Sequence, residues 1–225
     1  MITYNGGYTG WLGNQMFQYA AVRALGLRHD LPIFFPAKDP NLHDIFNLPQ
    51  TPFVDGDYTS YIESTFHYQE IPKRAENMVL FGYYQSEKYF KDFEDVIRED
   101  FTFRNPTDIK IEPGTTSLHV RRGDYVNLPD FHPLCTLDYY KEATSLFPDQ
   151  KFLVFSDDLE WCKVNIKGEN IKYSEGTSAV EDLQRMRLCD NHIIANSSFS
   201  WWGAWLGAND NKRVVAPKKW FGPDA

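Results

Sequence analysis

The sequence predicts an α/β protein built from parallel β-sheets in two successive domains. Short apolar runs of strand length alternate with segments of helical periodicity along the chain, which is the pattern of βαβ units. In the second half the strand-like runs are apolar on successive residues, as in parallel strands that are covered on both faces. Two prolines and a glycine in residues 104–116 predict a linker. We therefore expect domains at 1–104 and 105–225.

The first domain is expected to contain three strands and two helices. The strands are expected at 2–5, 32–35 and 78–83, and the helices at 14–29 and 87–101. Each helical segment gathers its apolar residues on one side, as an amphipathic helix does. The Pro- and Asp-rich stretch between Pro36 and Pro72 has no clear periodicity, so we expect loops and short turns there.

The second domain is expected to be more regular. Its strands are expected at 117–120, 151–155, 192–196 and 213–217, and its helices at 136–147, 157–164 and 178–190. The last helix carries a capping box, with Ser178 as N-cap and Glu181 three residues later. A smaller helix is expected to follow the segment SFSWWGAWLG at 198–207.

The composition of the chain excludes several classes of partner. The formal charge of −8 argues against a broad nucleic-acid or anionic-membrane surface, so any polyanion must bind in a local basic pocket. Three widely spaced cysteines with no CxxC pair indicate neither a disulfide framework nor a zinc site. The N-terminus does not resemble a signal peptide, and no run approaches the ~20 apolar residues that span a bilayer. We expect a cytoplasmic protein without an integral membrane segment.

The apolar run at 117–120 ends in two arginines, which a glycine and an aspartate follow. Ligands of open α/β sheets bind beyond the carboxyl ends of the strands, where Arg121, Arg122 and Asp124 are expected to lie. Two guanidinium groups, beside a glycine that lets the backbone approach a ligand, suit a diphosphate. The alternative interpretation is a structural Arg–Asp ion pair at the end of a strand.

A glycine-rich turn, GGYTGWLGNQ at 6–15, leads into the first expected helix. Its spacing is GxxGxxG rather than the GxGxxG of dinucleotide sites, and no Gly-Lys-Ser/Thr of a phosphate loop is present. A helix N-terminus that follows glycines presents free N–H groups to an anion or a sugar hydroxyl. Asn14 and Gln15 are therefore candidates to contact a ligand. The alternative is that Asn14 merely caps the helix.

Polar side chains also follow two further strands of the second domain. Asp157 and Asp158 form a carboxylate pair that suits a divalent cation, a purine edge or a helix cap. Ser197, Ser198 and Ser200 bring hydroxyl groups to an expected helix start, which suits a phosphate. The tryptophans beside these serines are expected to pack against the sheet. Arginines, aspartates and serines at three strand ends together indicate one site for a nucleotide diphosphate.

These motifs resemble glycosyltransferase family 11, the α-1,2-fucosyltransferases that use GDP-fucose. The resemblance is carried, in the order of that family, by LGNQMFQYA, HVRRGDY, FSDD, NSSFSWWGAWL and VVAPKKWF. It implies a GT-B fold, with two Rossmann-like domains facing each other across a cleft. In that fold 1–104 is the acceptor-side domain and 105–225 binds the GDP-sugar. The resemblance also implies catalysis without a metal and no cofactor besides the GDP-fucose donor.

The resemblance assigns roles to single residues. It implies that Arg121 holds the β-phosphate of GDP with support from Arg122, and that His119 and Asp157 contact guanine. Three serines are expected to contact phosphate and two amide residues to face the sugar-transfer point across the cleft. These are Ser197, Ser198 and Ser200, and Asn14 and Gln15.

The family's reaction moves L-fucose from GDP-β-L-fucose to the 2-hydroxyl of a galactose-terminated glycan. A β-linked donor and an α-linked product imply a single displacement with inversion. Arg121 is then expected to neutralise the departing diphosphate in place of a divalent cation. A base must accept the proton of the acceptor hydroxyl. Asp130 and Asp124 are ranked close together for that role, with His132 behind them.

Three alternatives remain open at this point. One is a metal-dependent GT-A transferase that uses the DGD of residues 55–57 as its metal-binding motif, although an acidic surface turn explains these residues better. The second is a non-catalytic relative that binds a nucleotide-sugar or a glycan. The third is a GDP-sugar transferase of different donor or linkage.

Overall fold

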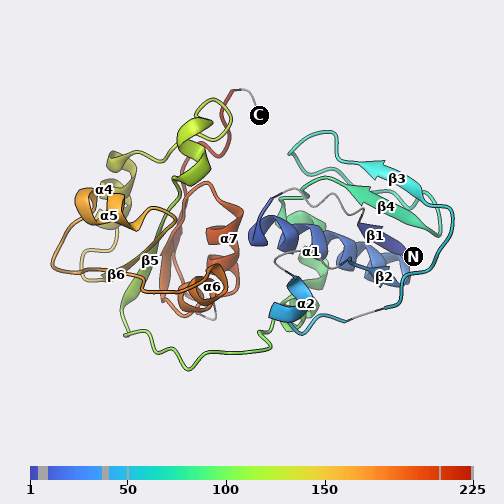
Figure 1. Cartoon of the computed structure of the whole chain (residues 1–225), viewed down its shortest axis with the longest axis horizontal. Helices are drawn as coiled ribbons and strands as arrows, with labels where there is room; N and C mark the ends of the chain where they lie inside the picture. Colours follow the sequence, from blue (N-terminus) through green and yellow to red (C-terminus); the bar gives the residue numbers. More distant parts are fainter. Residues whose placement is uncertain (5–9, 37–40, 50, 208, 224–225) are drawn as a thin grey trace. The chain divides into compact units, whose positions relative to one another are not determined.

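The computed structural model describes residues 1–4, 10–36, 41–49, 51–207 and 209–223. The chain divides into two compact units, Met1–Pro106 and Thr107–Ala225, and each contains a parallel β-sheet (Figure 1). The predicted α/β class is therefore confirmed. The stretch from 104 to 114 carries no helix or strand, and the first strand of the second unit begins at Thr115.

In the described part of the N-terminal unit, four parallel strands lie in the order β2-β1-β4-β3. They are β1 Ile2–Tyr4, β2 Ile33–Phe34, β3 Thr59–Ile62 and β4 Met78–Phe81. Three of them are the predicted strands, but β3 lies in the stretch that was expected to hold only loops and turns. It is an edge strand in which only Tyr61 is buried, so no alternation of apolar and polar residues marks it in the sequence.

The helices of this unit pack beside the sheet. They are α1 Leu12–His29, α2 Leu42–Ile45 and α3 Glu94–Asp100. The predicted helix at 87–101 is wrong in its first part, which forms two short 3₁₀ turns, Glu87–Tyr89 and Lys91–Phe93. Tyr19 of α1 donates a hydrogen bond of 2.7 Å to Asp100 at the end of α3, and Arg23 pairs with the same carboxylate at 2.9 Å. This buried carboxylate joins the two helices.

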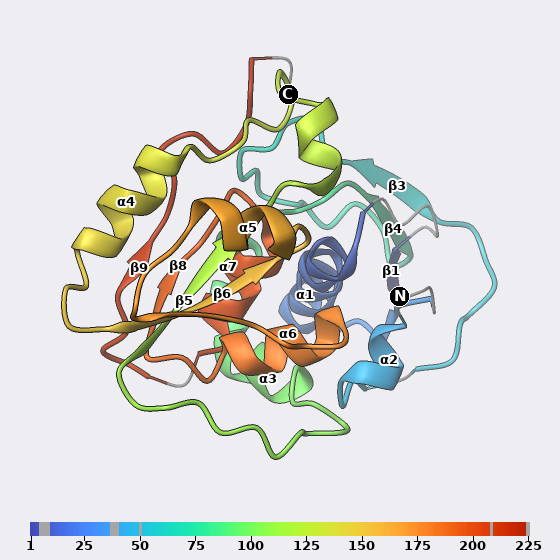
Figure 2. The same cartoon turned by 60° about the vertical axis from the view of Figure 1, so that its left-hand side comes forward.

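In the described part of the C-terminal unit, five parallel strands lie in the order β7-β6-β5-β8-β9. Figure 2 shows β6, β5, β8 and β9 side by side. They are β5 Thr115–Val120, β6 Lys151–Ser156, β7 Ile171–Tyr173, β8 Asn191–Ile193 and β9 Val214–Val215. The four predicted strands are confirmed, whereas β7, a short and partly exposed edge strand, was not predicted. The strand order reverses between β5 and β8, and such a switch point is where open α/β sheets bind ligands.

Helices cover both faces of this sheet. α4 Leu137–Ser145 and α5 Leu159–Asn165 lie on one face, and α6 Ala179–Met186 and α7 Ser198–Trp205 lie on the other (Figure 1). Leu118 and Val120 of β5 pack in the core below α4 and α5, whereas His119 points to the opposite face, toward Phe199 of α7. All six residues of β5 are buried. β5 is also the central strand of the five, so the residues that follow its carboxyl end lie at the middle of that edge of the sheet.

Helix caps account for several of the polar residues. Ser178 caps α6 by accepting a hydrogen bond from the N–H of Glu181, as predicted. In a capping box the Glu181 carboxylate would accept a hydrogen bond from the N–H of Ser178. It accepts instead from the N–H of Thr177, the preceding residue. The segment expected to precede a small helix is itself α7, with Trp202 and Trp205 buried. Within the described ranges, no helix is both long and apolar enough to cross a lipid bilayer.

Candidate active site at the carboxyl edge of the C-terminal sheet

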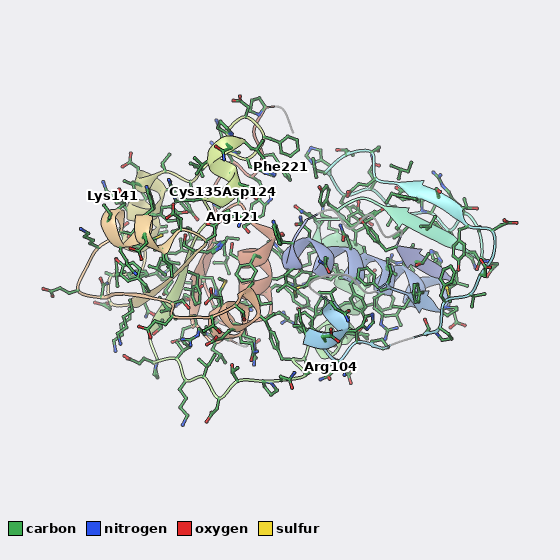
Figure 3. The ribbon with its side chains drawn as sticks, in the orientation of Figure 1. Arg104, Arg121, Asp124, Cys135, Lys141 and Phe221 are labelled. Carbon is green, nitrogen blue, oxygen red and sulfur yellow. The ribbon has the colours of Figure 1, made fainter. Side chains whose placement is uncertain are left out.

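Arg121 follows β5 at the switch point and is bonded to two carboxylates. Its Nη1 donates to Asp157 Oδ2 at 2.7 Å, and its Nη2 donates to Asp124 Oδ1 at 2.5 Å. Asp124 belongs to the 3₁₀ turn Gly123–Asn127 that follows the arginines, whereas Asp157 stands just beyond β6. Figure 3 shows Arg121 and Asp124 close together at this end of the unit. The fold thus brings together three of the predicted site residues.

Asp157 is held more firmly than this single ion pair suggests. Its other oxygen, Oδ1, accepts a hydrogen bond of 2.9 Å from the backbone N–H of Arg122. The backbone of Gly123 passes so close that an added Cβ would lie 2.4 Å from Asp157 Oδ2. A glycine is therefore required here by close approach rather than by its backbone angles.

Arg122 turns away from Arg121 and joins β5 to α5. Its Nε donates to Asp158 Oδ2 at 3.0 Å, and its guanidinium lies 4.0 Å from the ring centroid of Trp161. Asp158 also caps α5 by accepting from the N–H of Trp161, and this bond, followed by the one from Arg122, lowers the pKa of the Asp158 carboxyl group. The structural Arg–Asp ion pair considered from the sequence is found within the motif, between Arg121 and Asp124, and a second pair joins Arg122 to Asp158.

His119 lies one residue inside the end of β5 and is 5% exposed. Its Nδ1 has no hydrogen-bond partner among the described residues. Burial, with a further contribution from the positive charge of Arg121, lowers the pKa of His119 to about 3. The imidazole is therefore neutral at physiological pH, and it can both donate and accept a hydrogen bond.

The three candidate serines surround the start of α7. Ser197 is the N-cap residue, but its side chain makes no capping hydrogen bond, and Ser198 is the first residue of the helix. The N-terminal end of a helix carries a partial positive charge that suits an anion, although the Ser197 N–H already donates to the Ala195 carbonyl at 2.8 Å. The buried hydroxyl of Ser200 donates instead to the carbonyl oxygens of Ser197 at 3.3 Å and Ala195 at 3.5 Å.

The candidate bases lie on the turn and the loop that follow the arginines. The side chains of Asp124 and Asp130 are exposed. The ring of His132 stacks on the ring of Tyr125, and the Arg121 guanidinium carbon lies 5.1 Å from the Tyr125 ring centroid. Partial burial lowers the pKa of His132. No local sequence signal predicted the contacts of Tyr125, although this residue ends the HVRRGDY motif.

Asn196, just beyond β8, ties this loop to the C-terminal segment. Its side-chain N–H groups donate to the carbonyl oxygens of Pro133 and Trp220, both at 3.0 Å. The backbone carbonyl of Asn196 accepts a hydrogen bond from the Tyr125 hydroxyl at 3.1 Å. Gly222 adds a bond of 2.9 Å from its N–H to the carbonyl of Phe131. Residues far apart in sequence thereby fix the loop that carries Asp130 and His132.

In the N-terminal unit, Asn14 and Gln15 lie in the first turn of α1. Trp11 is the N-cap residue, so the alternative that Asn14 caps the helix is wrong. Asn14 Oδ1 accepts a hydrogen bond of 2.8 Å from Gln85 Nε2, and Gln15 is buried. Gly10, at φ 93°, leaves the space that the Asn14 side chain occupies. The earlier glycines of this turn lie outside the described residues.

Comparison with known proteins identifies the family. The model of the family described as Glycosyl transferase family 11 matches residues 27–222, which is most of the chain. The chain belongs to glycosyltransferase family 11. The resemblance of its motifs to this family is thereby confirmed, and the protein is a glycosyltransferase. The matched range contains all the predicted donor-binding residues, whereas Asn14 and Gln15 precede it.

Named relatives of this family 11 chain come from bacteria and animals. It is 31% identical, over an alignment 268 positions long, to an α-1,2-colitosyltransferase of Escherichia coli, covering 94% of this chain and 90% of the relative. It is 36% identical over 165 residues to the O-antigen biosynthesis glycosyltransferase WbnK of Escherichia coli, covering 63% and 55%. It is 28% identical over 236 residues to galactoside α-(1,2)-fucosyltransferase 2 of Hylobates lar, covering 89% and 68%.

Proposed function

We propose that this family 11 enzyme transfers L-fucose from GDP-β-L-fucose to the 2-hydroxyl of a terminal galactoside, with inversion and without a metal ion. The observation that carries the proposal is the placement of the Arg121 guanidinium at the switch point of the C-terminal sheet, beyond the carboxyl end of β5. The names of the relatives support an α-1,2 linkage. A GT-B arrangement of the two units, with the donor on 105–225 and the acceptor on 1–104, is part of the proposal.

The proposed donor site extends from Arg121 along the edge of the sheet. Arg121 binds the β-phosphate and Arg122 supports the turn, while Ser197 and Ser198 are proposed to contact phosphate oxygens at the positive, N-terminal end of α7. The neutral imidazole of His119 is suited to guanine, which presents both hydrogen-bond donors and acceptors. Asp157 is the second proposed guanine contact, through the lone pairs that its bonds to the arginines leave free. Ser200 is proposed to act indirectly, because its hydroxyl group donates to the backbone carbonyls of Ala195 and Ser197 and so holds the start of α7 in place.

The proposed reaction is a single displacement. The acceptor oxygen forms a bond to the anomeric carbon as the bond from that carbon to the GDP oxygen breaks, and the electron pair of the broken bond leaves with the β-phosphate. Arg121 stabilises the growing negative charge on that phosphate. The hydroxyl proton passes to Asp130 or Asp124, with His132 ranked behind them. Asn14 and Gln15 are proposed to contribute to the acceptor side.

A second donor is favoured by one observation, the 31% identity to an α-1,2-colitosyltransferase over nearly the whole chain. Colitose is fucose without its 3-hydroxyl group, so the two donors present the same GDP group to the arginines. The GT-A alternative has less support, because Asp55 and Asp57 are exposed and Asp55 accepts a hydrogen bond of 3.0 Å from the N–H of Gly56 in a surface turn.

The test is incubation with each GDP-sugar and a free galactoside, followed by mass spectrometry of the galactoside. A gain of one deoxyhexose from GDP-fucose supports the proposal, and a product one oxygen atom lighter from GDP-colitose supports the second donor. Binding of GDP-fucose without any product supports the non-catalytic alternative and contradicts the proposal. Methylation analysis of the product, which should show a galactose substituted at its 2-hydroxyl, distinguishes the linkage.

A further inference from the structure

The two terminal nitrogens of Arg121 are both bonded to carboxylates in the structure, Nη1 to Asp157 at 2.7 Å and Nη2 to Asp124 at 2.5 Å. A guanidinium binds phosphate through the same pair of N–H directions that it uses for carboxylates. A donor diphosphate and these carboxylates therefore compete for the same donors. To bind the β-phosphate with two hydrogen bonds, Arg121 must release at least one of its carboxylates.

The two carboxylates differ in how firmly they are held. Asp157 accepts a second hydrogen bond from the backbone N–H of Arg122, packs against Gly123, and has a side chain that is 26% exposed. The side chain of Asp124 is 52% exposed. Within the described residues, the Asp124 carboxylate makes no hydrogen bond besides the one from Arg121. An exposed ion pair of this kind changes an equilibrium constant by only about two- to fivefold.

We propose that Asp157 is a positioning residue that keeps Arg121 in place throughout the reaction, and that Asp124 occupies the position of a donor phosphate oxygen and leaves when the donor binds. This inference rests on the proposed function, because it takes a nucleotide diphosphate as the ligand. Displacement frees the Asp124 carboxylate, a candidate base, only when the donor is present. Deprotonation of the acceptor is then coupled to occupation of the donor site.

The test compares the dissociation constants of GDP and GMP, measured by titration calorimetry on the full chain. Their ratio isolates the contribution of the β-phosphate. In Asp124→Asn the competitor loses its charge, so GDP should bind about two- to fivefold more tightly while GMP changes by less than twofold. In Asp157→Asn the anchor is lost, so GDP should bind roughly tenfold or more weakly and the GDP preference over GMP should shrink.

Two further variants test whether the changes in GDP binding come from the position of Asp157 and not from a general loss of negative charge. Gly123→Ala keeps all charged groups but forces Asp157 away, because the new Cβ would lie 2.4 Å from its Oδ2, and it should reproduce the weaker GDP binding of Asp157→Asn. Asp138→Asn removes an equally negative but 85% exposed side chain on α4 and should leave both constants unchanged. Circular dichroism of each variant reports whether the fold is kept.

The possible outcomes separate this inference from the proposed function. If Arg121→Ala leaves GDP binding unchanged, the proposed function is contradicted. If Arg121→Ala weakens GDP binding but Asp124→Asn does not tighten it, only the displacement of Asp124 is overturned. If Asp157→Asn weakens GDP and GMP by the same factor, Asp157 contacts guanine alone and is not the anchor of Arg121.

Discussion

The imidazole of His132 lies flat on the phenol ring of Tyr125, with 4.3 Å between the ring centroids and 8° between the ring planes. Tyr125 also contacts the Arg121 guanidinium, and its hydroxyl group donates a hydrogen bond to the carbonyl oxygen of Asn196. The ring of Tyr125 therefore contacts both Arg121, the residue proposed to bind the phosphate, and His132, a candidate base.

The ring of Tyr125 should matter more for catalysis than its hydroxyl group. Tyr125→Leu loses the stacking on His132 and the contact with Arg121, each worth roughly 1 kcal/mol, so kcat should fall about tenfold or more. Tyr125→Phe keeps the ring and loses only the bond to Asn196, so its effect should be smaller. Steady-state kinetics of the two variants decide this. An equal loss in both would show that the hydroxyl bond, rather than the ring, is what matters.

Replacing Arg121 should stop transfer without unfolding the protein. Arg121→Ala removes the charge that faces the leaving phosphate and should lower kcat roughly 10²–10³-fold. Arg121→Lys keeps the charge but cannot bond two partners in a fork, so most of this loss should remain. Arg213→Lys is the matched control, because Arg213 lies over Phe147 elsewhere in the same unit. Near-native turnover in Arg121→Ala would rule out the proposed role.

The identity of the base can be resolved by three alanine variants. Removal of a positioned base should lower kcat by about 10²–10⁴-fold, whereas a residue with no essential role should cost less than about tenfold. Asp130→Ala, Asp124→Ala and His132→Ala are compared at saturating donor and acceptor. We expect the large loss in one of the two aspartate variants. A large loss in His132→Ala alone would reverse the ranking.

The C-terminal unit should lose stability as the pH falls from 8 to 5.5. Burial lowers the folded-state pKa of His119 to about 3 and that of His192 to about 4. Because the unfolded value is near 6.5, the unfolded chain binds more protons in this range. The stability from the two neutral histidines is complete above pH 6.5, and about 2–3 kcal/mol of it should be gone at pH 5.5.

Urea unfolding at several pH values measures this effect. Tryptophan fluorescence is a suitable probe, since five of the six tryptophans, all but Trp11, lie in the C-terminal unit. His67→Gln, at an exposed position of the N-terminal unit, is the control and should keep the same pH dependence. A free energy of unfolding that stays constant between pH 8 and 5.5 would contradict the prediction.

Metal removal should leave the activity intact, because Arg121 is proposed to supply the positive charge that a divalent ion supplies in other transferases. The rate of transfer is measured in excess chelator and again after addition of Mg²⁺ or Mn²⁺, and the rates should agree within about twofold. A rate that collapses in chelator and returns with metal would instead favour a metal-dependent mechanism.

Much of the C-terminal unit could be predicted from local sequence. The strands β5, β6 and β8 are apolar runs typical of buried parallel strands, and the apolar run of β9 was predicted in the same way although β9 is an edge strand with no buried residue. The Ser178 cap depends on residues three apart. The HVRRGDY motif, placed after a strand, was enough to predict where Arg121 and Asp124 would lie, because the carboxyl ends of parallel strands share one edge.

Other features could not be predicted because they depend on distant partners. β3 and β7 are edge strands with few buried residues, so their pairing comes from the neighbouring strand rather than from their own apolar pattern. Asn196, a small polar residue after β8, gives no local sign that its amide binds Pro133 and Trp220.

By itself the sequence determined the fold class, the family and the edge of the sheet where the charged residues gather, since these follow from apolar periodicity and from motifs of a few adjacent residues. Only the tertiary structure decided the partners of those residues. Arg121 meets Asp157 across 36 positions of the chain, and this contact exists because β5 and β6 pair in register and end together. Ion pairs and ring contacts act over a few ångströms, so they are settled by packing and not by order along the chain.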